Sequence, residues 1–312
     1  MHTLRLTLAV PVIAFSLLAS YLSFAQTTKA DVVSISPPRY ELFGNPGDII
    51  NEKLKVRNDG TSDLTYQTDV RDFTASGEEG GIDINDDPNA PKSNFSLARW
   101  MVVQPSRFTV PAGQEKIIDI GIRIPKNAES GGHYASVQVV SSGANLSGSG
   151  ASVQSNLNSL ILLRVSGDIT EKLTAKSFHA EFPYYQTGPV SFLLTTQNSG
   201  NVHVAPSGTI TITDMFGRKV KEIPLIPANV LPNSFRTIKT VFTDTSMIGR
   251  FTATLVANYG SGAQKQPITG TTTFIVVPLY LIWILIALIV IIFLGLTQRS
   301  ALKRLLHNLT SD

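Results

Sequence analysis

The sequence predicts an all-β protein with two antiparallel β-sandwiches in tandem and one transmembrane helix near its C-terminus. Across residues 30–273, short runs rich in β-branched residues are bounded by Gly, Pro, Asn and Ser, and helical periodicity is hard to find. Strands at this spacing are typical of antiparallel sandwiches. The stretch Phe274–Leu296 carries no charge. The residues between an apolar leader and this stretch are numerous enough for two domains.

Several predicted strands alternate between apolar and polar residues. In the segment Lys53–Arg57, Leu54 and Val56 point to one side and the basic residues point to the other, as expected for a half-buried strand. The clearest strand candidates are Ile49–Arg57, Leu64–Phe73, Glu115–Ile124, Tyr134–Val140, Leu160–Val165, Val190–Thr196, Thr209–Thr213, Ile238–Thr243 and Phe251–Val256. Their number and spacing fit two sandwiches better than one.

The two halves of this region repeat a pattern of turn residues. The corresponding segments are Asn58–Gly60 and Asn198–Gly200, Val110–Gly113 and Val230–Asn233, and the single residues Gly131 and Gly249. We predict that each Asn-x-Gly sequence supplies a turn with positive φ between two strands. Two copies of one Ig-like module explain the repeat, with domains at residues 26–166 and 167–273 and a boundary near Gly167.

Both ends of the chain carry targeting features. Residues 1–25 combine a basic start, an apolar run and small residues before Ala25, which predicts a secretory signal peptide; an uncleaved anchor is the alternative. As a helix, Phe274–Leu296 would span about 34 Å, enough for a hydrocarbon core of about 30 Å. Pro278 fits the first turn of that helix, so the residues before it could form the last strand of the preceding domain.

The distribution of charge predicts the orientation in the membrane. Tyr280 and Trp283 lie near the outer end of the apolar stretch, and basic residues follow its inner end. We therefore predict a single-pass protein with extracytoplasmic N-terminal domains and a short basic cytoplasmic tail, residues 297–312. All but four of the 26 basic residues and all but one of the 23 acidic residues lie within residues 26–273, so this region is neutral. The charge balance gives no support for a nucleic-acid partner.

The search for catalytic chemistry finds no motif. The chain has no cysteine, which excludes disulfides and thiolate chemistry and favours a bacterial source for an exported protein. His133, His179 and His203 form no zinc-binding pattern, and neither a nucleophile elbow nor a phosphate-binding loop occurs. We predict a protein that is not an enzyme, with no catalytic, cofactor-binding or metal-binding residues. We expect His133 to be a partly exposed structural residue.

Three further features leave alternatives open. The segment Asp72–Pro91 holds six carboxylates, and we expect a solvated insertion loop; whether it binds calcium stays open, because its spacing misses the EF-hand pattern. We expect Ser141–Asn156 to be a flexible connection. Trp100 is expected to pack in a core, with glycan stacking as the alternative, and the pair Tyr184 and Tyr185 is the better candidate for exposed aromatics.

The order of turns in residues 32–140 resembles a known family. The features are Ser36-Pro37-Pro38, Gly47-Asp48, Asn58-x-Gly60, an irregular insertion, Ser96-Leu97-x-x-Trp100, Pro111-x-Gly113, Ile124-Pro125 and Gly131-Gly132. This order resembles the N-terminal Ig-like domain of the bacterial cell-surface proteins that interact with WxL-domain proteins, in which the domain is considered peptidoglycan-binding. More distantly, it resembles the first domain of PapD-type pilus chaperones. The resemblance rests on turns and names no ligand-contacting residue.

These observations predict a membrane-anchored bacterial cell-surface protein whose Ig-like ectodomain binds cell-wall polymer or another surface protein. Shape complementarity or the addition of a partner strand to a sheet edge would provide the binding. The alternative is a membrane-tethered, PapD-like assembly chaperone for exported subunits. That hypothesis predicts an exposed apolar edge strand and a basic residue in the cleft between the domains, for which Arg39 is the candidate. An enzyme is the most distant alternative, and the oligomeric state stays open.

Overall fold

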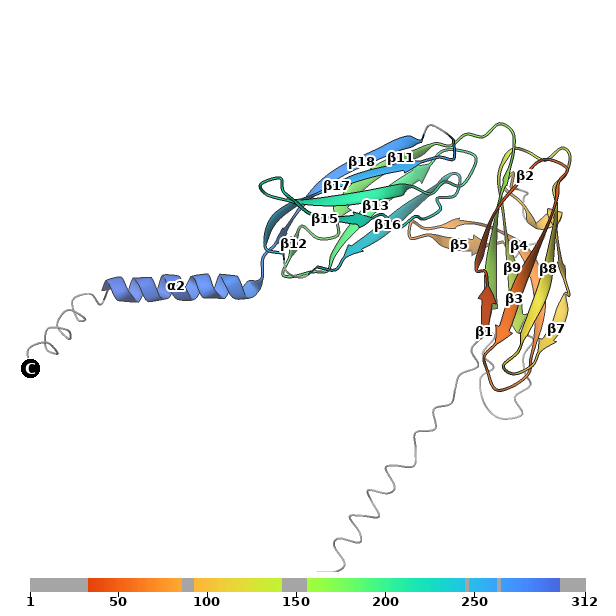
Figure 1. Ribbon diagram of the computed structural model, residues 1–312, viewed down its shortest axis with the longest axis horizontal. Helices are drawn as coiled ribbons and strands as arrows, with labels where there is room; N and C mark the ends of the chain where they lie inside the picture. The colour runs from red at the N-terminus through yellow and green to blue at the C-terminus, as the bar shows by residue number, and fades with distance from the viewer. Residues whose placement is uncertain (1–32, 86–92, 142–155, 245–246, 263–264, 298–312) are drawn as a thin grey trace, which may run out of the picture.

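A computed structural model describes residues 33–85, 93–141, 156–244, 247–262 and 265–297. The all-β fold is confirmed: two Ig-like sandwiches, inclined to one another, are followed by one C-terminal helix that leaves the far end of the second sandwich (Figure 1). The predicted signal peptide and nearly all of the basic tail lie outside the described residues. So do Asp86 and Asp87 of the acidic segment and most of Ser141–Asn156.

The first domain is built from two sheets and one short 3-10 helix, η1 (Ala98–Trp100). One sheet has the strand order β1 (Val33–Ser36), β3 (Ile49–Asn58), β8 (Glu115–Arg123) and β6 (Met101–Gln104). The other has the order β2 (Arg39–Gly44), β10 (Asn156–Val165), β9 (Gly131–Ser141), β4 (Leu64–Ser76) and β5 (Gly81–Ile84), with β7 (Arg107–Val110) also paired to β4. The chain crosses between the sheets at Pro37 and Pro38, which lack the N–H that would continue a ladder.

The second domain repeats this two-sheet design. Its smaller sheet has the order β11 (Leu173–Ala180), β13 (Val190–Asn198) and β16 (Ser234–Phe242). Its larger sheet has the order β12 (Tyr184–Tyr185), β18 (Gln266–Val276), β17 (Gly249–Tyr259), β14 (Ser207–Asp214) and β15 (Lys219–Pro224). Each domain has its own buried apolar core, and Leu54 and Val56 lie in the first core as the alternation predicts.

The Asn-x-Gly repeat is real, but the predicted role of its residues is wrong. Asn58 and Asn198 are fully buried, and each side-chain amide donates to two backbone carbonyls, one four residues ahead and one on a distant segment. The carboxamide oxygen of Asn198 accepts from the N–H of Gly200 at 2.8 Å. Gly200 has no positive φ; a Cβ there would lie 2.2 Å from the carbonyl oxygen of Thr170. Close approach of backbone, and not turn geometry, requires this glycine.

Other positions of the repeat do have the left-handed backbone. Gly131 and Gly249, at the starts of β9 and β17, have φ values of +125° and +122°. Gly113 and Asn233, before β8 and β16, have φ values of +71° and +55°. The same strained positions in both halves support the prediction that one module occurs twice.

The apolar helix begins later than predicted. The helix α2 spans Leu279–Thr297, whereas Phe274 belongs to β18, which continues to Val276. Phe274 and Val276 are buried in the second domain, so packing extends the strand into the apolar stretch. Pro278 lies between strand and helix, as its missing N–H predicts. Within the described part of the chain, α2 is the one helix that is long and apolar enough to cross a membrane.

We predict that replacing the buried Asn198 with Ala destabilises the second domain by about 2 to 4 kcal/mol, because the carbonyls of Val202 and Val230 lose their donor inside a dry core. Urea unfolding of the protein measures the change. The matched control is Asn258→Ala, an exposed asparagine on β17, which should change the free energy of unfolding by less than about 0.5 kcal/mol. Equal effects of the two substitutions would contradict the role of Asn198.

Candidate functional site: the cleft between the domains

The two domains meet at the outer face of the β2-β10-β9-β4-β5 sheet. Phe73, Tyr134 and Leu162 point away from the core of the first domain and form a separate buried cluster, with Leu231 of the second domain packed against it. The rings of Phe73 and Tyr134 lie 5.9 Å apart. Apolar side chains on the outer face of a sheet need a cover. The second domain supplies part of that cover.

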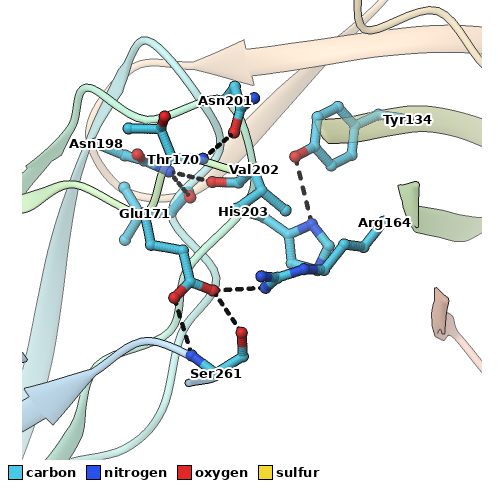
Figure 2. A network of polar contacts seen from close by, with 10 residues as sticks. Tyr134, Arg164, Thr170, Glu171, Asn198, Asn201, Val202, His203 and Ser261 are labelled. Carbon is cyan, nitrogen blue, oxygen red and sulfur yellow. Dashed lines mark hydrogen bonds and ion pairs between the residues drawn. The ribbon is translucent and has the colours of Figure 1, made fainter. Parts of the chain in front are cut away.

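Polar contacts lie beside Tyr134 of this cluster (Figure 2). The Tyr134 hydroxyl lies 3.3 Å from Nδ1 of His203, which joins β9 to the second domain. The Arg164 guanidinium of β10 pairs with Glu171 at 2.5 Å. The same carboxylate accepts hydrogen bonds from the N–H and the hydroxyl of Ser261 at 2.9 and 2.8 Å. The contacts connect the end of the first domain to two separate segments of the second.

Burial changes the titration of these groups. It lowers the pKa of His203 to about 4, and the positive charges of Arg164 and Arg39 act in the same direction. Burial also raises the pKa of the Tyr134 hydroxyl. For Glu171, burial alone would raise the pKa, but the hydrogen bonds from Arg164 and Ser261 hold it below its usual value. At neutral pH the junction therefore contains a neutral imidazole, a neutral phenol and one ion pair.

Two arginines, Arg39 and Arg236, line the same cleft beside this junction. Arg39 begins β2, and its Nε lies 3.1 Å from Oε1 of Glu41. The same Oε1 accepts a 2.6 Å hydrogen bond from Nδ2 of Asn229, in the second domain. Arg236, on β16, donates from Nη1 to the carbonyl oxygen of Asn229 at 2.7 Å. Burial and the positive charge of Arg39 both lower the pKa of Arg236, although it stays a cation.

The arginines line a small cleft between the domains. The cleft has a volume of about 60 Å³. Its apolar wall is formed by Phe73, Ala75, Ile82, Leu160, Leu162, Leu231 and Phe235. The charged residues of its lining are Arg39 and Arg236, both cations, next to the apolar wall. Such a place favours a ligand with an anionic group next to apolar side chains.

The hairpin that joins β4 and β5 closes one side of the cleft. The carbonyl oxygen of Glu78 accepts from the N–H of Thr237 at 2.6 Å, so the hairpin tip of the first domain pairs with the edge strand β16 of the second. Gly80 lies against Arg236, and a Cβ there would come within 2.4 Å of Nη2. Figure 1 shows β5 reaching toward β16. This part of the acidic segment is therefore a docking hairpin.

The structure also corrects the expected solvated loop at Asp72. This residue lies within β4, which continues to Ser76. One carboxylate oxygen of Asp72 accepts from the N–H groups of Leu97 and Ala98 at 2.9 and 2.8 Å, and the other accepts from the Ser96 hydroxyl. Asp72 thus holds the segment before η1 in place. Among the described residues, no group of three His, Cys, Asp or Glu is arranged to hold a metal.

The other residues singled out in the sequence lie apart from the cleft. His133 is buried and not partly exposed. Its two ring nitrogens lie 3.1 and 3.0 Å from the carbonyl oxygens of Ser96 and Glu129, so both have a partner inside the domain. The Trp100 ring lies 4.3 Å from the His133 ring, tilted by 46°, and packs against the first core. His179 is exposed on β11. Tyr184 is exposed, as predicted, whereas Tyr185 is partly buried against the second core.

By its architecture, the chain is a two-domain all-β protein of Ig-like sandwiches with a C-terminal apolar helix. No protein-family model and no curated protein matches its sequence.

Among solved structures, it is similar to the class 5 fimbriae chaperone CfaA, with 15% identity and a TM-score of 0.40 over 77% of this chain and 99% of that chain. It is similar to a chain of the Salmonella enterica SafA pilin–SafB chaperone complex, with 13% identity and a TM-score of 0.39 over 78% and 97% of the two chains. It is also similar to a chain of the Acinetobacter baumannii CsuC–CsuE chaperone complex, with 12% identity and a TM-score of 0.35 over 66% and 89%. At such identities the likeness concerns the fold alone, and membership of the WxL-interacting family stays a prediction.

We predict that the stability of the domain junction falls as the pH decreases from about 6.5 to about 4. The folded pKa of His203 lies below the unfolded value of about 6.5, so the unfolded chain binds the proton first and protonation favours the open state. The groups that face the imidazole are Tyr134, Arg164, Arg39, Glu41 and Glu171. The maximum loss is about 3 kcal/mol.

Thermal melts across this pH range measure the effect, and small-angle scattering detects opening of the junction. The substitution His203→Gln should flatten the pH dependence. The control His179→Gln alters an exposed histidine and should leave it unchanged. An unaltered pH profile in His203→Gln would show that His203 does not control the junction.

Proposed function

We propose that this chain is a membrane-anchored protein that binds an exported polypeptide in the cleft between its domains, as an assembly chaperone does. The observation that carries the proposal is the pair Arg39 and Arg236. Arg39 pairs with Glu41, and Arg236 donates to the carbonyl oxygen of Asn229, whose side-chain amide donates to the same Glu41 carboxylate. The C-terminal carboxylate of a polypeptide, or an acidic side chain, would supply the missing negative charge. The apolar wall of the cleft would receive the neighbouring side chain.

The edge strand β2 supports this proposal. It is the last strand of its sheet, and no strand pairs with its outer edge among the described residues. Phe43 on this strand is 64% exposed. An extended segment could therefore add to the sheet through backbone hydrogen bonds, which give affinity with little sequence preference. Because β2 begins at Arg39, the end of such a segment would lie beside the guanidinium.

We propose binding and not catalysis as the role of the cleft. Its titratable groups are engaged in contacts that join the domains: Glu41 with Asn229, and His203 with Tyr134. A general acid or base must meet its substrate with a free proton-transfer atom. The cleft offers cations and backbone edges instead, which suit recognition of an anionic, extended chain.

The proposed location is extracytoplasmic, with α2 as a single membrane span. The helix is uncharged, and none of its residues is buried. The predicted signal peptide at one end and basic residues beyond α2 at the other support this orientation. Protease added to intact cells should then remove both domains and spare residues 297–312.

A second candidate function is saccharide binding on the opposite side of the first domain. A hollow of about 650 Å³ lies beside β6 and β8. Its lining includes Trp100, Asn51, Gln104 and Asp119. An aromatic ring beside amide and carboxylate groups is suited to a sugar ring. This hollow is the observation that favours cell-wall polymer as a ligand.

We predict that Arg39→Ala combined with Arg236→Ala lowers the affinity for extended peptides with a free C-terminal carboxylate by at least tenfold, because a charge-assisted contact is lost. The probe is a pool of peptides with alternating apolar residues, in free-acid and amidated forms, measured by fluorescence anisotropy. The parent protein should prefer the free acid, and the double variant should not. Arg107→Ala, an exposed arginine on β7, is the matched control. No binding in either form, with retention of murein by the parent protein, would favour the saccharide site instead.

A further inference from the structure

The end of the second domain that adjoins α2 exposes apolar side chains from several separate segments. Phe216 and Tyr184 are 73% and 71% exposed, and Met215, Ile248 and Val277 are also exposed. We call these five residues the membrane-proximal rim. Exposed apolar residues gathered at one end of a domain indicate a contact surface.

Strand register places the rim residues at one end. In the larger sheet, Asp214 pairs with Phe251, so the turn after β14 lies beside the start of β17. Gly249 pairs with Val276, so Ile248 and Val277 lie at the same end. Tyr185 also pairs with Val276 through β12, which brings Tyr184 there. Figure 1 shows α2 leaving the domain at the end where β12 lies.

The turn that carries Phe216 is rigidly built. One carboxylate oxygen of Asp214 accepts from the N–H groups of Phe216 and Arg218, both at 2.9 Å, and the other accepts from Nε of Arg218 at 2.7 Å. Gly217 has the left-handed backbone that closes the turn, with φ of +78°. The Arg218 guanidinium lies over the Phe216 ring at 5.4 Å. The bonds hold an aromatic and a cation outward together, although exposure of Phe216 to water is unfavourable.

The distance between the rim and the helix is short. Strand β18 ends at Val276 and α2 begins at Leu279. Two intervening residues span at most about 10 Å between those ends. A hollow of about 320 Å³ between the domain and the first helical turns is lined by Tyr184, Tyr185, Gln186, Ile275, Val277, Leu279 and Ile282. Domain and helix thus share one apolar surface.

We propose that the membrane-proximal rim is a lipid-binding surface that rests in the interfacial layer of the bilayer. This inference depends on the membrane span of the proposed function. Tyr and Trp rings prefer the headgroup level, apolar side chains such as Phe216 enter the boundary between headgroups and acyl chains, and a guanidinium above them can reach lipid phosphates. Tyr184 and Phe216 enter this layer, together with Tyr280 and Trp283 of the helix. The second domain is then held against the membrane at several points and cannot swing on Val277 and Pro278.

Because the chain has no cysteine, a single cysteine can be introduced and labelled to test the contact between the rim and lipid. Single substitutions Phe216→Cys, Ile286→Cys and Val256→Cys can each carry an environment-sensitive fluorophore in the full chain. Val256 is an exposed apolar residue on β17, away from the rim, and is the matched negative control. Ile286, in the middle of α2, reports the span. The labelled chains are reconstituted into phosphatidylcholine vesicles with or without a lipid that carries a shallow nitroxide quencher.

Quenching at position 216 should exceed quenching at position 256 at least twofold, and position 286 should be quenched most strongly by a nitroxide deeper in the acyl chain. Quenching at 286 with equal, weak quenching at 216 and 256 overturns the rim contact and leaves the span intact. Absence of quenching at 286 overturns the span and the rim contact together. Thermal melts of each labelled chain verify that the fold is retained.

Discussion

The arrangement of the two sandwiches depends on the junction around Tyr134, where apolar side chains on the outer face of a sheet are buried beside the second domain. This face carries Phe73 and Leu162, which would otherwise meet water, and burial of such area contributes roughly 25 cal/mol per Å². Apolar contact alone does not specify an angle. Directional bonds at its edge, Tyr134 to His203 and Arg164 to Glu171, add orientation, and Ser261 holds the Glu171 carboxylate in place within the second domain. That arrangement brings Arg39 of the first domain and Arg236 of the second to the same cleft.

Much of the fold could be predicted because its signals are local. The alternation in Lys53–Arg57 indicates a strand by itself, and the position of Pro278 indicates where a strand gives way to a helix. The repeat of Asn-x-Gly could also be found locally, but its mechanism could not. Asn58 and Asn198 bridge to the carbonyls of Val110 and Val230, which are distant in sequence. The Asn-x-Gly motif, which is typical of turns, therefore contains a buried asparagine whose long-range hydrogen bonds cannot be predicted from the local sequence.

The candidate site was only half predictable. Arg39 was a candidate from its own sequence context, whereas Arg236 and Asn229 reach the cleft only through the packing of the second domain on the first. One local signal could have revealed that packing. The run Leu160–Leu163 has no polar position, which is typical of a strand buried on both faces. Because a sandwich strand needs burial on one face only, this run indicates that another layer covers the outer face.

The junction between the domains and the membrane-proximal rim together determine how high the cleft lies above the membrane. Strand β17 runs from the rim at Gly249 to Tyr259, next to the loop in which Ser261 binds Glu171 at the junction. At about 3.3 Å per residue, this strand measures about 35 Å. With the rim in the bilayer interface, the junction end of the second domain then lies on the order of 35 Å above the lipid headgroups, and a domain free to swing would not keep the cleft at a fixed height. About ten extended residues span that distance. A polypeptide still held in the membrane could thus reach Arg39 and Arg236 only through an extended segment of that length, whereas a fully exported one could approach with its terminus free. The proposed carboxylate contact therefore favours a fully exported partner.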